Sequence, residues 1–291
     1  MFYDFNIPYP NTCDATELER IEKILSRIQS FDSHSIIALN LSVEDKLVNV
    51  KPIPPIKPDN FKNMRQLTRA TLLIEDPKRN YQLAASSSYP NIDILAVRPT
   101  TIDVCKHACQ TLEVDMISLD LAKTKVSPGF VSAQVAVNRG VFFEICYSQS
   151  FRDPARKFAF FNAVKRLVEV TRGHNLIFSS EAIRALEIRR PSDIRMLGSM
   201  FGMTQDQMEE SLSVNYPRLL KKAGKFENHP QQQQKKIELL TIFIFFAETR
   251  RMTYNAVIGI DIEPMVESQL KRKELESSSS SSNKRAKKVK S

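Results

Sequence analysis

Short apolar runs rich in β-branched residues alternate with amphipathic helical stretches as far as about residue 180, and this alternation constrains the fold most strongly. Residues with the character of strands lie at 2–7, 35–41, 66–74, 93–98, 116–121, 141–147 and 175–179. Helical patterns lie between them, at 15–30, 77–87, 101–112, 128–138 and 154–172. Strands separated by helices pair in parallel through right-handed crossovers. The sequence therefore predicts an α/β fold, either an open doubly wound sheet or a closed barrel.

Glycine is scarce, which weighs against the doubly wound sheet with a nucleotide site. The chain has only 7 Gly, with no GxGxxG after the first strand and no GxxxxGK[ST] anywhere. A phosphate-binding loop needs such glycines for close backbone approach. Three further helical patterns, at 191–201, 204–213 and 216–222, are suited to cap one end of a barrel. Residues 46–63 contain Pro52, Pro54, Pro55 and Pro58, so we expect an extended surface loop there.

The composition predicts a soluble intracellular protein. A length of 291 residues with 42% hydrophobic residues allows one large domain or two small ones around a sizeable core. No run of eighteen or more apolar residues occurs, and residues 1–4 lack the features of a signal peptide, so we expect no membrane partner. The four cysteines are expected to be reduced. Cys105 and Cys109 would share a helix face, and we interpret them as small buried residues rather than metal ligands.

The formal net charge of +9 is distributed unevenly. Residues 1–150 carry 16 basic and 17 acidic side chains, whereas residues 151–225 carry 14 and 8. Residues 271–291 carry 8 basic and 2 acidic side chains. Because a basic surface attracts phosphates, we expect any nucleic-acid interface of the folded part to lie in its second half.

The residues needed for catalysis are hard to find in this sequence. The histidines, at 34, 107, 174 and 229, are scattered and never form HxH or HExxH, so we expect no metal site and no cofactor. The predicted strands contain four acidic residues, Asp4, Asp93, Asp120 and Glu144. Either these form a catalytic cluster, or they form a buried polar network with Arg69, Arg98 or Arg139. We favour the network, because a carboxylate inside a barrel needs a partner and no complementary base is evident.

Several segments resemble the thirty-kilodalton protein subunit family of nuclear ribonuclease P and ribonuclease MRP. The signature lies at residues 175–182 (NLIFSSEA), 186–194 (LEIRRPSDI) and 197–203 (LGSMFGM). Supporting matches in the right order are Asp4, 36–40 (IIALN), 67–69 (LTR), Asp76-Pro77, 112–115 (LEVD), 138–140 (NRG) and 143–148 (FEICYS). The resemblance covers residues 1 to about 222.

The resemblance implies a distorted TIM-like barrel related to the PHP phosphoesterases, followed by C-terminal helices. It also implies a non-catalytic subunit that stabilises the catalytic RNA during 5′ leader removal from precursor tRNA, usually paired with a small RRM-like subunit. We expect contact with precursor tRNA to be indirect, and the protein to lie in the nucleus and nucleolus. PHP enzymes carry HxH at the end of the first strand, where this chain has Asp4-Phe5-Asn6. The fold would then be inherited without the active site.

Candidate site residues follow from charge and from the signature. The predicted RNA-binding residues are Arg69, Arg98, Arg139, Arg152, Arg156, Lys157, Arg189 and Arg190. The predicted structural polar network consists of Asp4, Glu144 and Asp193. Asp193 lies four positions after Arg189, so it would either orient that guanidinium toward a phosphate or form a structural ion pair with it. Two other functions stay open, a PHP-like metal-dependent phosphoesterase and a scaffold subunit that contacts protein alone.

Beyond the barrel, which we place at residues 1–222, the sequence changes character. Residues 223–247 combine a glutamine run with an apolar run, and the resemblance resumes at 248–262. The 225–247 segment is either a helix or strand packed on the barrel or the translation of an unspliced intron. We favour the intron, and transcript sequencing across this segment distinguishes the two. Residues 263–291 read as a disordered Ser-rich basic tail. Its bipartite clusters Lys271, Arg272, Lys273 and Lys284, Arg285, Lys287, Lys288 predict a nuclear import signal, the alternative being non-specific RNA binding.

Overall fold

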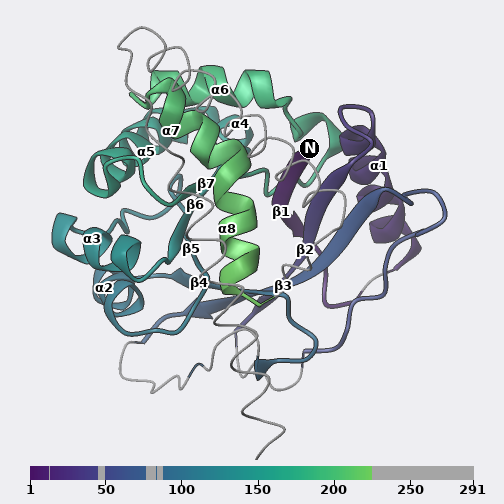
Figure 1. Cartoon of the computed structure of the whole chain (residues 1–291), viewed down its shortest axis with the longest axis horizontal. Helices are drawn as coiled ribbons and strands as arrows, with labels where there is room; N and C mark the ends of the chain where they lie inside the picture. Colours follow the sequence, from purple (N-terminus) through teal and green to yellow (C-terminus); the bar gives the residue numbers. More distant parts are fainter. Residues whose placement is uncertain (13, 45–49, 77–82, 84–87, 225–291) are drawn as a thin grey trace, which may run out of the picture. The chain divides into compact units, whose positions relative to one another are not determined.

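Seven parallel strands follow one another around the sheet in sequence order (Figure 1). They are β1 (Phe2–Pro8), β2 (Ser35–Val43), β3 (Met64–Ile74), β4 (Ile94–Pro99), β5 (Met116–Ser118), β6 (Phe142–Cys146) and β7 (Leu176–Ser179). The computed structural model describes residues 1–12, 14–44, 50–76, 83 and 88–224. All seven predicted strands are confirmed, with ends that differ by a few residues.

Helices connect the strands and cover the outside of the sheet (Figure 1). The connecting helices are α1 (Ala15–Gln29), α2 (Ile102–Gln110), α3 (Phe130–Asn138), α4 (Gln149–Arg152), the 3-10 turn η3 (Pro154–Arg156) and α5 (Lys157–Thr171). After β7 come the 3-10 turn η4 (Ala185–Glu187), α6 (Pro191–Met200), α7 (Gln205–Glu209), the π-helical turn η5 (Glu210–Val214) and α8 (Asn215–Lys222). The helix predicted at 77–87 lies almost entirely outside the described residues. The helix predicted at 154–172 is divided, because η3 precedes α5.

Side chains at the ends of the helices explain where several of them begin. Asp14 accepts a hydrogen bond from the Glu17 N–H at 2.8 Å, and Thr101 accepts one from Val104 at 3.3 Å. Asp153 accepts one from Ala155 at 3.0 Å, directly before η3. Each acceptor satisfies an N–H group that has no partner within its own helix.

The sheet curls until its first and last strands approach each other. The Ser180 N–H, just after β7, donates to Asp4 Oδ1 in β1 at 3.0 Å. Residues on the outer face of the strands, such as Ile7 and Leu39, pack against Ile21 and Ile24 of α1. Seven parallel strands with helices outside and a sheet that nearly closes make a TIM-like α/β barrel, and this confirms the predicted fold class.

The half of the barrel interior at the amino ends of the strands is apolar, and α8 covers it. Its inward-facing residues are Phe5, Ala38, Leu67, Ile94, Ala96, Met116, Phe142 and Ile177, packed with Tyr216, Leu219 and Leu220 of α8. The Tyr216 ring stacks on Tyr3 with centroids 4.7 Å apart, and its hydroxyl donates to the Phe178 carbonyl. Of the C-terminal helices that we expected to cap one end of the barrel, α8 does so. Ile194 of α6 and Met208 of α7 pack instead in the cluster on the outer face of the sheet.

The proline-rich connection between β2 and β3 is a surface loop over its described residues, as predicted, and two buried side chains anchor it. Residues 50–63 contain no helix or strand, yet Ile56 and Phe61 are buried in the cluster beneath α1. The Gln66 side chain bonds both the N–H and the carbonyl of Ile56, each at 2.8 Å. Cys105 and Cys109 are buried, as expected, on the inner face of α2. None of the described helices is long and apolar enough to span a membrane.

Candidate functional site

The half of the interior at the carboxyl ends of the strands is polar. In β2 to β7 the inward face becomes polar two residues after its last apolar side chain, with Asn40, Arg69, Thr71, Arg98, Ser118, Glu144, Cys146 and Ser179. In β1 the polar residue is Asn6, directly after Phe5, where the register of the strand shifts. Alternate residues of a strand share a face, so this polar layer stands above the apolar one. In TIM-like barrels this end carries the functional site.

Arg69 and Glu144 form a buried ion pair at the centre of this layer. Both side chains are 0% exposed, Arg69 Nη2 lies 2.8 Å from Glu144 Oε2, and Nη1 donates to Oε1. Nη1 also donates to the Phe5 carbonyl at 2.8 Å, and Nε donates to the Thr71 hydroxyl at 3.0 Å. Burial acts to raise the pKa of Glu144, but the Arg69 guanidinium prevails and holds this pKa at about 2. The Glu144 carboxylate is therefore ionised, and both of its oxygens accept hydrogen bonds from Arg69.

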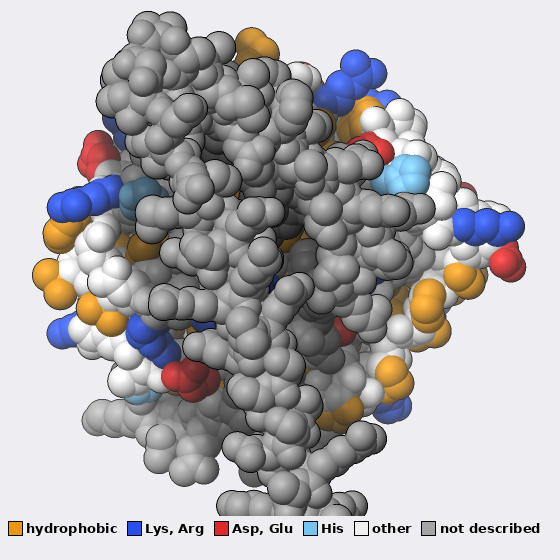
Figure 2. All heavy atoms as spheres, in the orientation of Figure 1, with side chains coloured by type: hydrophobic (Ala, Val, Ile, Leu, Met, Phe, Trp, Pro, Cys, Tyr) orange, Lys and Arg blue, Asp and Glu red, His pale blue; other side chains and the backbone are white. Residues whose placement is uncertain are grey.

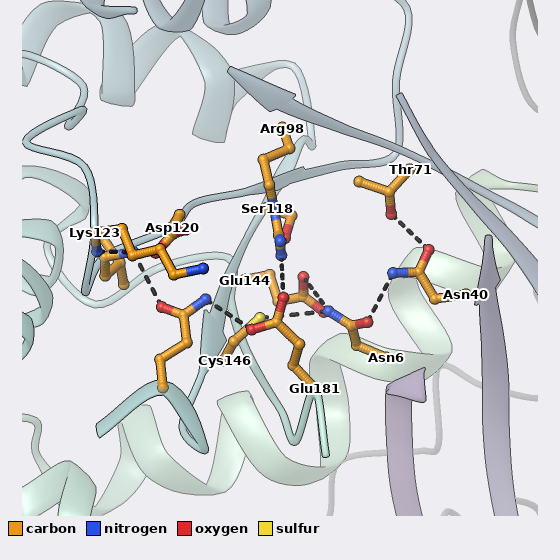
Figure 3. A network of polar contacts seen from close by, with 12 residues as sticks. Asn6, Asn40, Thr71, Arg98, Ser118, Asp120, Lys123, Glu144, Cys146 and Glu181 are labelled. Atoms are coloured by element: carbon orange, nitrogen blue, oxygen red, sulfur yellow. Dashed lines mark hydrogen bonds and ion pairs between the residues drawn. The ribbon is translucent and has the colours of Figure 1, made fainter. Parts of the chain in front are cut away.

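Two asparagines extend the network toward β2 and β3 (Figure 3). Asn6 Nδ2 donates to Glu144 Oε2 at 3.2 Å and lies 3.4 Å from Cys146 Sγ. Asn40 Nδ2 donates to Asn6 Oδ1 at 2.8 Å, and the Thr71 hydroxyl donates to Asn40 Oδ1 at 2.7 Å. The chain of donors and acceptors leads back to Arg69 through Thr71. Such a closed network rigidifies a barrel interior.

Asp4 belongs to the same end of the barrel but has different partners. Its Oδ1 accepts from the N–H groups of Ser180 at 3.0 Å and Asn6 at 3.2 Å. Its Oδ2 is buried and, within the described residues, has no hydrogen-bond partner. Burial raises the pKa of Asp4 to about 6, although the hydrogen bonds from Ser180 and Asn6 act in the opposite direction. Asp4 therefore ties β1 to the end of β7 without joining the Arg69 pair.

A second ion-pair network lies at the rim of the barrel mouth and is centred on Glu181. This carboxylate lies 2.7 Å from Arg98, accepts from Gln149 Nε2 at 2.8 Å and lies 3.8 Å from Arg152 (Figure 3). Glu181 adopts a left-handed backbone conformation, with φ of 52°, two residues after the end of β7. Arg98 also donates to Ser118 at 2.8 Å, so it connects the rim with the inner layer.

A hollow of about 330 Å³ lies beside Glu181 at this mouth. Its lining residues are Arg98, Asp120, Ala122, Lys123, Gln149, Arg152, Asp153, Arg156, Glu181 and Ile183. Four cations and three carboxylates thus face one another across it. Within the described residues, no group of three or more His, Cys, Asp or Glu has the arrangement of a metal site.

The structure separates the eight arginines and lysines predicted to contact RNA. Arg98 and Arg152 lie at the rim, and Arg152 also pairs with Glu187 at 3.2 Å. Arg156 forms an exposed pair with Asp153 at 3.0 Å, and the Lys157 ammonium lies 6.0 Å from the Phe161 ring centroid. Figure 2 shows Lys and Arg at several separate places around the visible face, without merging into one patch among the visible side chains.

Arg189 and Arg190, adjacent in the chain, each lie over an aromatic ring. The Arg189 guanidinium lies 4.7 Å from the Phe151 centroid, and that of Arg190 lies 5.4 Å from the Phe31 centroid. A guanidinium stacked on a ring keeps its N–H edge available for a phosphate. Both side chains are therefore held in a shape suited to phosphate contact.

Three of the predicted roles need correction. Arg69 is completely buried against Glu144, so it belongs to the polar network and not to an RNA-facing surface. Arg139 donates to the carbonyls of Cys109 at 2.9 Å and Leu112 at 2.7 Å, so it closes the end of α2 away from the mouth. Asp193 is also remote from the barrel interior. It accepts from the Arg190 N–H at 3.4 Å at the start of α6 and does not join Asp4 and Glu144.

Sequence reasoning missed Asn6, Asn40 and Glu181. The first two stand on inward positions of predicted strands, where a polar amide in an apolar run signals a buried network. Glu181 lies in the first signature block, directly after a predicted strand, which is the usual position of mouth residues in a barrel. The predicted import signal and the 225–247 segment lie outside the described residues.

The parallel barrel and its mouth of arginine, asparagine and carboxylate side chains define the class of this protein. It is a TIM-like barrel whose inner polar side chains hydrogen-bond mainly to one another. A family model described as RNase P subunit p30 matches residues 1–227. The chain belongs to this family of ribonuclease P protein subunits. The expected family resemblance is thereby confirmed.

Individual relatives agree with this membership. The chain is 33% identical over 198 residues to the ribonuclease P protein subunit p30 of Mus musculus, covering 62% of this chain and 73% of the relative. It is 29% identical over 267 residues to the probable ribonuclease P protein subunit 3 of Schizosaccharomyces pombe, covering 89% and 99%. A chain of archaeal ribonuclease P, solved with mature tRNA, matches with a TM-score of 0.56 at 11% identity, covering 78% and 94%. This last likeness shows the fold alone.

Proposed function

We propose that this chain is a non-catalytic protein subunit of ribonuclease P that binds and stabilises the catalytic RNA. The RNA would then carry out removal of the 5′ leader from precursor tRNA. Family membership over residues 1–227 supports the assignment to the complex. The names of the mouse and fission yeast relatives point to the same complex.

The observation that carries the non-catalytic role is the Arg69–Glu144 pair. Glu144 is the inward carboxylate of the polar layer, and both of its oxygens accept from Arg69. Arg98 brings a second permanent cation to the same end of the barrel. Two guanidinium groups oppose the entry of a divalent cation, and a carboxylate held at a pKa of about 2 is a poor general base near neutral pH.

RNA contact is better supported for some candidates than for others. Arg156, Lys157 and Arg190 are exposed and Arg189 is partly buried, and all four lie in the second half of the barrel sequence, which carries the excess positive charge of the barrel. Arg152 and Arg98 are half-buried and held by Glu181, so we assign them to shaping the mouth. We propose Arg189 and Arg190 as the principal phosphate contacts, because ring stacking already orders their side chains.

Further parts of the proposal concern partners and location. By resemblance, we propose that the chain also serves ribonuclease MRP and thereby ribosomal RNA processing, and that it pairs with a small RRM-like subunit. We place it in the nucleus and nucleolus, with the basic clusters of 271–291 as the import signal. Contact with precursor tRNA would be indirect.

Affinity purification tests the proposal directly. The tagged full-length chain should recover the ribonuclease P RNA together with cleavage of precursor tRNA at the 5′ leader. Particles that contain Glu144→Gln should cleave at the wild-type rate per assembled particle. Metal-dependent phosphoester hydrolysis by the purified chain, abolished by Asp4→Asn and Glu144→Gln, would favour the phosphoesterase. Recovery of the particle with no crosslink from this chain to RNA would favour the protein-only scaffold.

A further inference from the structure

Two phenylalanines flank three basic side chains on the surface at residues 151–158, beside the mouth of the barrel. Phe158 is 78% exposed, more than any other phenylalanine in the described part of the chain, and Phe151 is 38% exposed. Arg152, Arg156 and Lys157 stand between them. These residues form α4, η3 and the first turn of α5, which contact one another. Water solvates the cations well, but exposure of the two phenylalanine rings beside them is unfavourable and indicates a contact surface.

The hydrophobic core does not use the Phe158 ring. Two residues further along α5, the Phe160 and Phe161 rings pack against Phe201 with centroids 6.2 and 5.0 Å apart. Phe158 is not among the buried residues of α5. The Phe158 ring is therefore exposed to solvent in the first turn of α5, directly after Arg156 and Lys157.

The hollow at the barrel mouth adjoins this segment. Arg152 and Arg156 line the hollow, and the exposed Ile183 supplies an apolar part of its wall. Among the residues that the structure describes, Arg156 forms an ion pair with Asp153 alone, and such exposed pairs contribute little energy. Arg156 can therefore exchange its carboxylate for a phosphate at small cost.

Together these features suit one kind of ligand. An apolar ring and an aliphatic wall accept a flat base, while Arg156 and Lys157 accept phosphates. A base-paired helix keeps its bases stacked inside and presents phosphates and sugars, so it would leave Phe158 in water. An unpaired nucleotide presents both parts at once.

We propose that residues 151–158 and Ile183 bind an unpaired nucleotide of the RNA in the complex, with its base on Phe158 and its phosphates at Arg156 and Lys157. This inference rests on the proposed RNA-binding function and adds the class of RNA element that this surface recognises. Phe158 is then a specificity residue for unpaired over paired RNA.

The test compares two RNA hairpins of equal length, one with a single-nucleotide bulge and one perfectly paired. The full chain should bind the bulged hairpin more tightly. Phe158→Ala should weaken that binding by about five- to a hundredfold, leave binding to the paired hairpin unchanged and abolish the preference. Phe158→Tyr should keep the preference, because its ring still stacks. Equal affinity of the wild-type chain for the two hairpins would overturn the proposal.

Phe130→Ala is the matched control. Phe130 is 48% exposed on α3 and has the Arg172 guanidinium 5.4 Å from its centroid, so it offers a comparable ring and cation elsewhere on the barrel. It should not alter the preference. In particles purified through the tagged chain, Phe158→Ala should expose at least one unpaired base to dimethyl sulfate that wild-type and Phe130→Ala particles protect. Unchanged base reactivity would refute this inference alone, whereas particles without RNA would refute the proposed function itself.

Discussion

Arg69 and Glu144 lie 75 residues apart in the chain, on β3 and β6, and meet as a fully buried ion pair inside the barrel. Because both side chains are buried, water cannot hydrogen-bond to one of them if the other is removed. The Thr71 hydroxyl and the Phe5 carbonyl accept from two further N–H groups of the guanidinium, so the geometry is complete only when β1, β3 and β6 are all in place. The pair is thus a consequence of barrel closure.

Breaking this pair should be costly. Glu144→Gln leaves the Arg69 guanidinium buried without its counterion and should lower the free energy of unfolding by about 3–5 kcal/mol. Replacing both residues, as Arg69→Met with Glu144→Leu, should cost less than Glu144→Gln alone, since neither charge of the pair remains buried. Denaturant titration of the full chain measures both. A Glu144→Gln variant as stable as wild type would show that the pair contributes nothing.

Acid should also act through this pair. The pKa of Glu144 falls from an ordinary 4.5 to about 2 in the folded chain, so its contribution is present above pH 4.5 and is lost as the pH falls toward 2. Unfolding curves recorded between pH 5 and 2 should show this loss in wild type and a smaller loss in Glu144→Gln. Parallel curves for the two proteins would contradict the assignment.

Asp4 should have the opposite pH dependence. Its pKa rises from 3.8 to about 6, so its contribution to stability is fully present below pH 3.8 and is lost as the pH rises through 6. A shift of this size corresponds to about 3 kcal/mol at most. Asp4→Asn should remove the decline in stability between pH 4 and 7, while the exposed Asp59→Asn should leave it unchanged. Stability curves against pH for the three proteins decide the matter.

The helix that covers the apolar end of the barrel depends on Tyr216. Tyr216→Ala removes its stacking on Tyr3 and its edge contact with Phe5, whose centroid lies 4.9 Å away, and should cost about 3–5 kcal/mol. Tyr216→Phe keeps the ring and loses only the hydrogen bond to the Phe178 carbonyl, so about 1 kcal/mol is expected. Amide exchange should show α8 opening in Tyr216→Ala. If Phe and Ala variants lose equal stability, the hydroxyl and not the ring holds the helix.

Arg189 should contribute to RNA affinity through its charge and its ring contact. Arg189→Ala should weaken association and reduce the slope of log affinity against log salt by about one counterion. Arg189→Lys should restore the slope but not the full affinity, because an ammonium lacks the planar fork. Arg218→Ala, an exposed arginine on α8, is the control. A large fall in thermal stability with unaltered RNA binding would make Arg189 structural.

Deleting residues 271–291 tests the basic tail. The deletion removes 8 Lys and Arg, and nuclear accumulation of the protein should fall while the thermal stability of the barrel stays unchanged. Fluorescence microscopy of tagged full-length and truncated chains measures the first effect. Unchanged nuclear import would leave non-specific RNA binding as the explanation of the tail.

Local patterns in the sequence were enough to place the strands and the ends of several helices. Short apolar runs rich in β-branched residues identify strands that are buried on both faces, and Asp14 and Asp153 mark helix starts by the donors that they satisfy. The scarcity of glycine and the family signature then separated a barrel from a nucleotide-binding sheet. These inferences need only residues close in the chain, whose interactions do not depend on the rest of the fold.

The partners of the buried charges were decided by the tertiary structure alone. From the sequence, Arg69, Arg98 and Arg139 were equivalent candidates for pairing with a strand carboxylate. Barrel closure turns Arg69 toward Glu144, turns Arg98 toward Glu181 and leaves Arg139 at the end of α2. The physical reason is that an ion pair needs two side chains within about 4 Å, and residues distant in the chain reach that separation only through the curvature and register of the whole sheet.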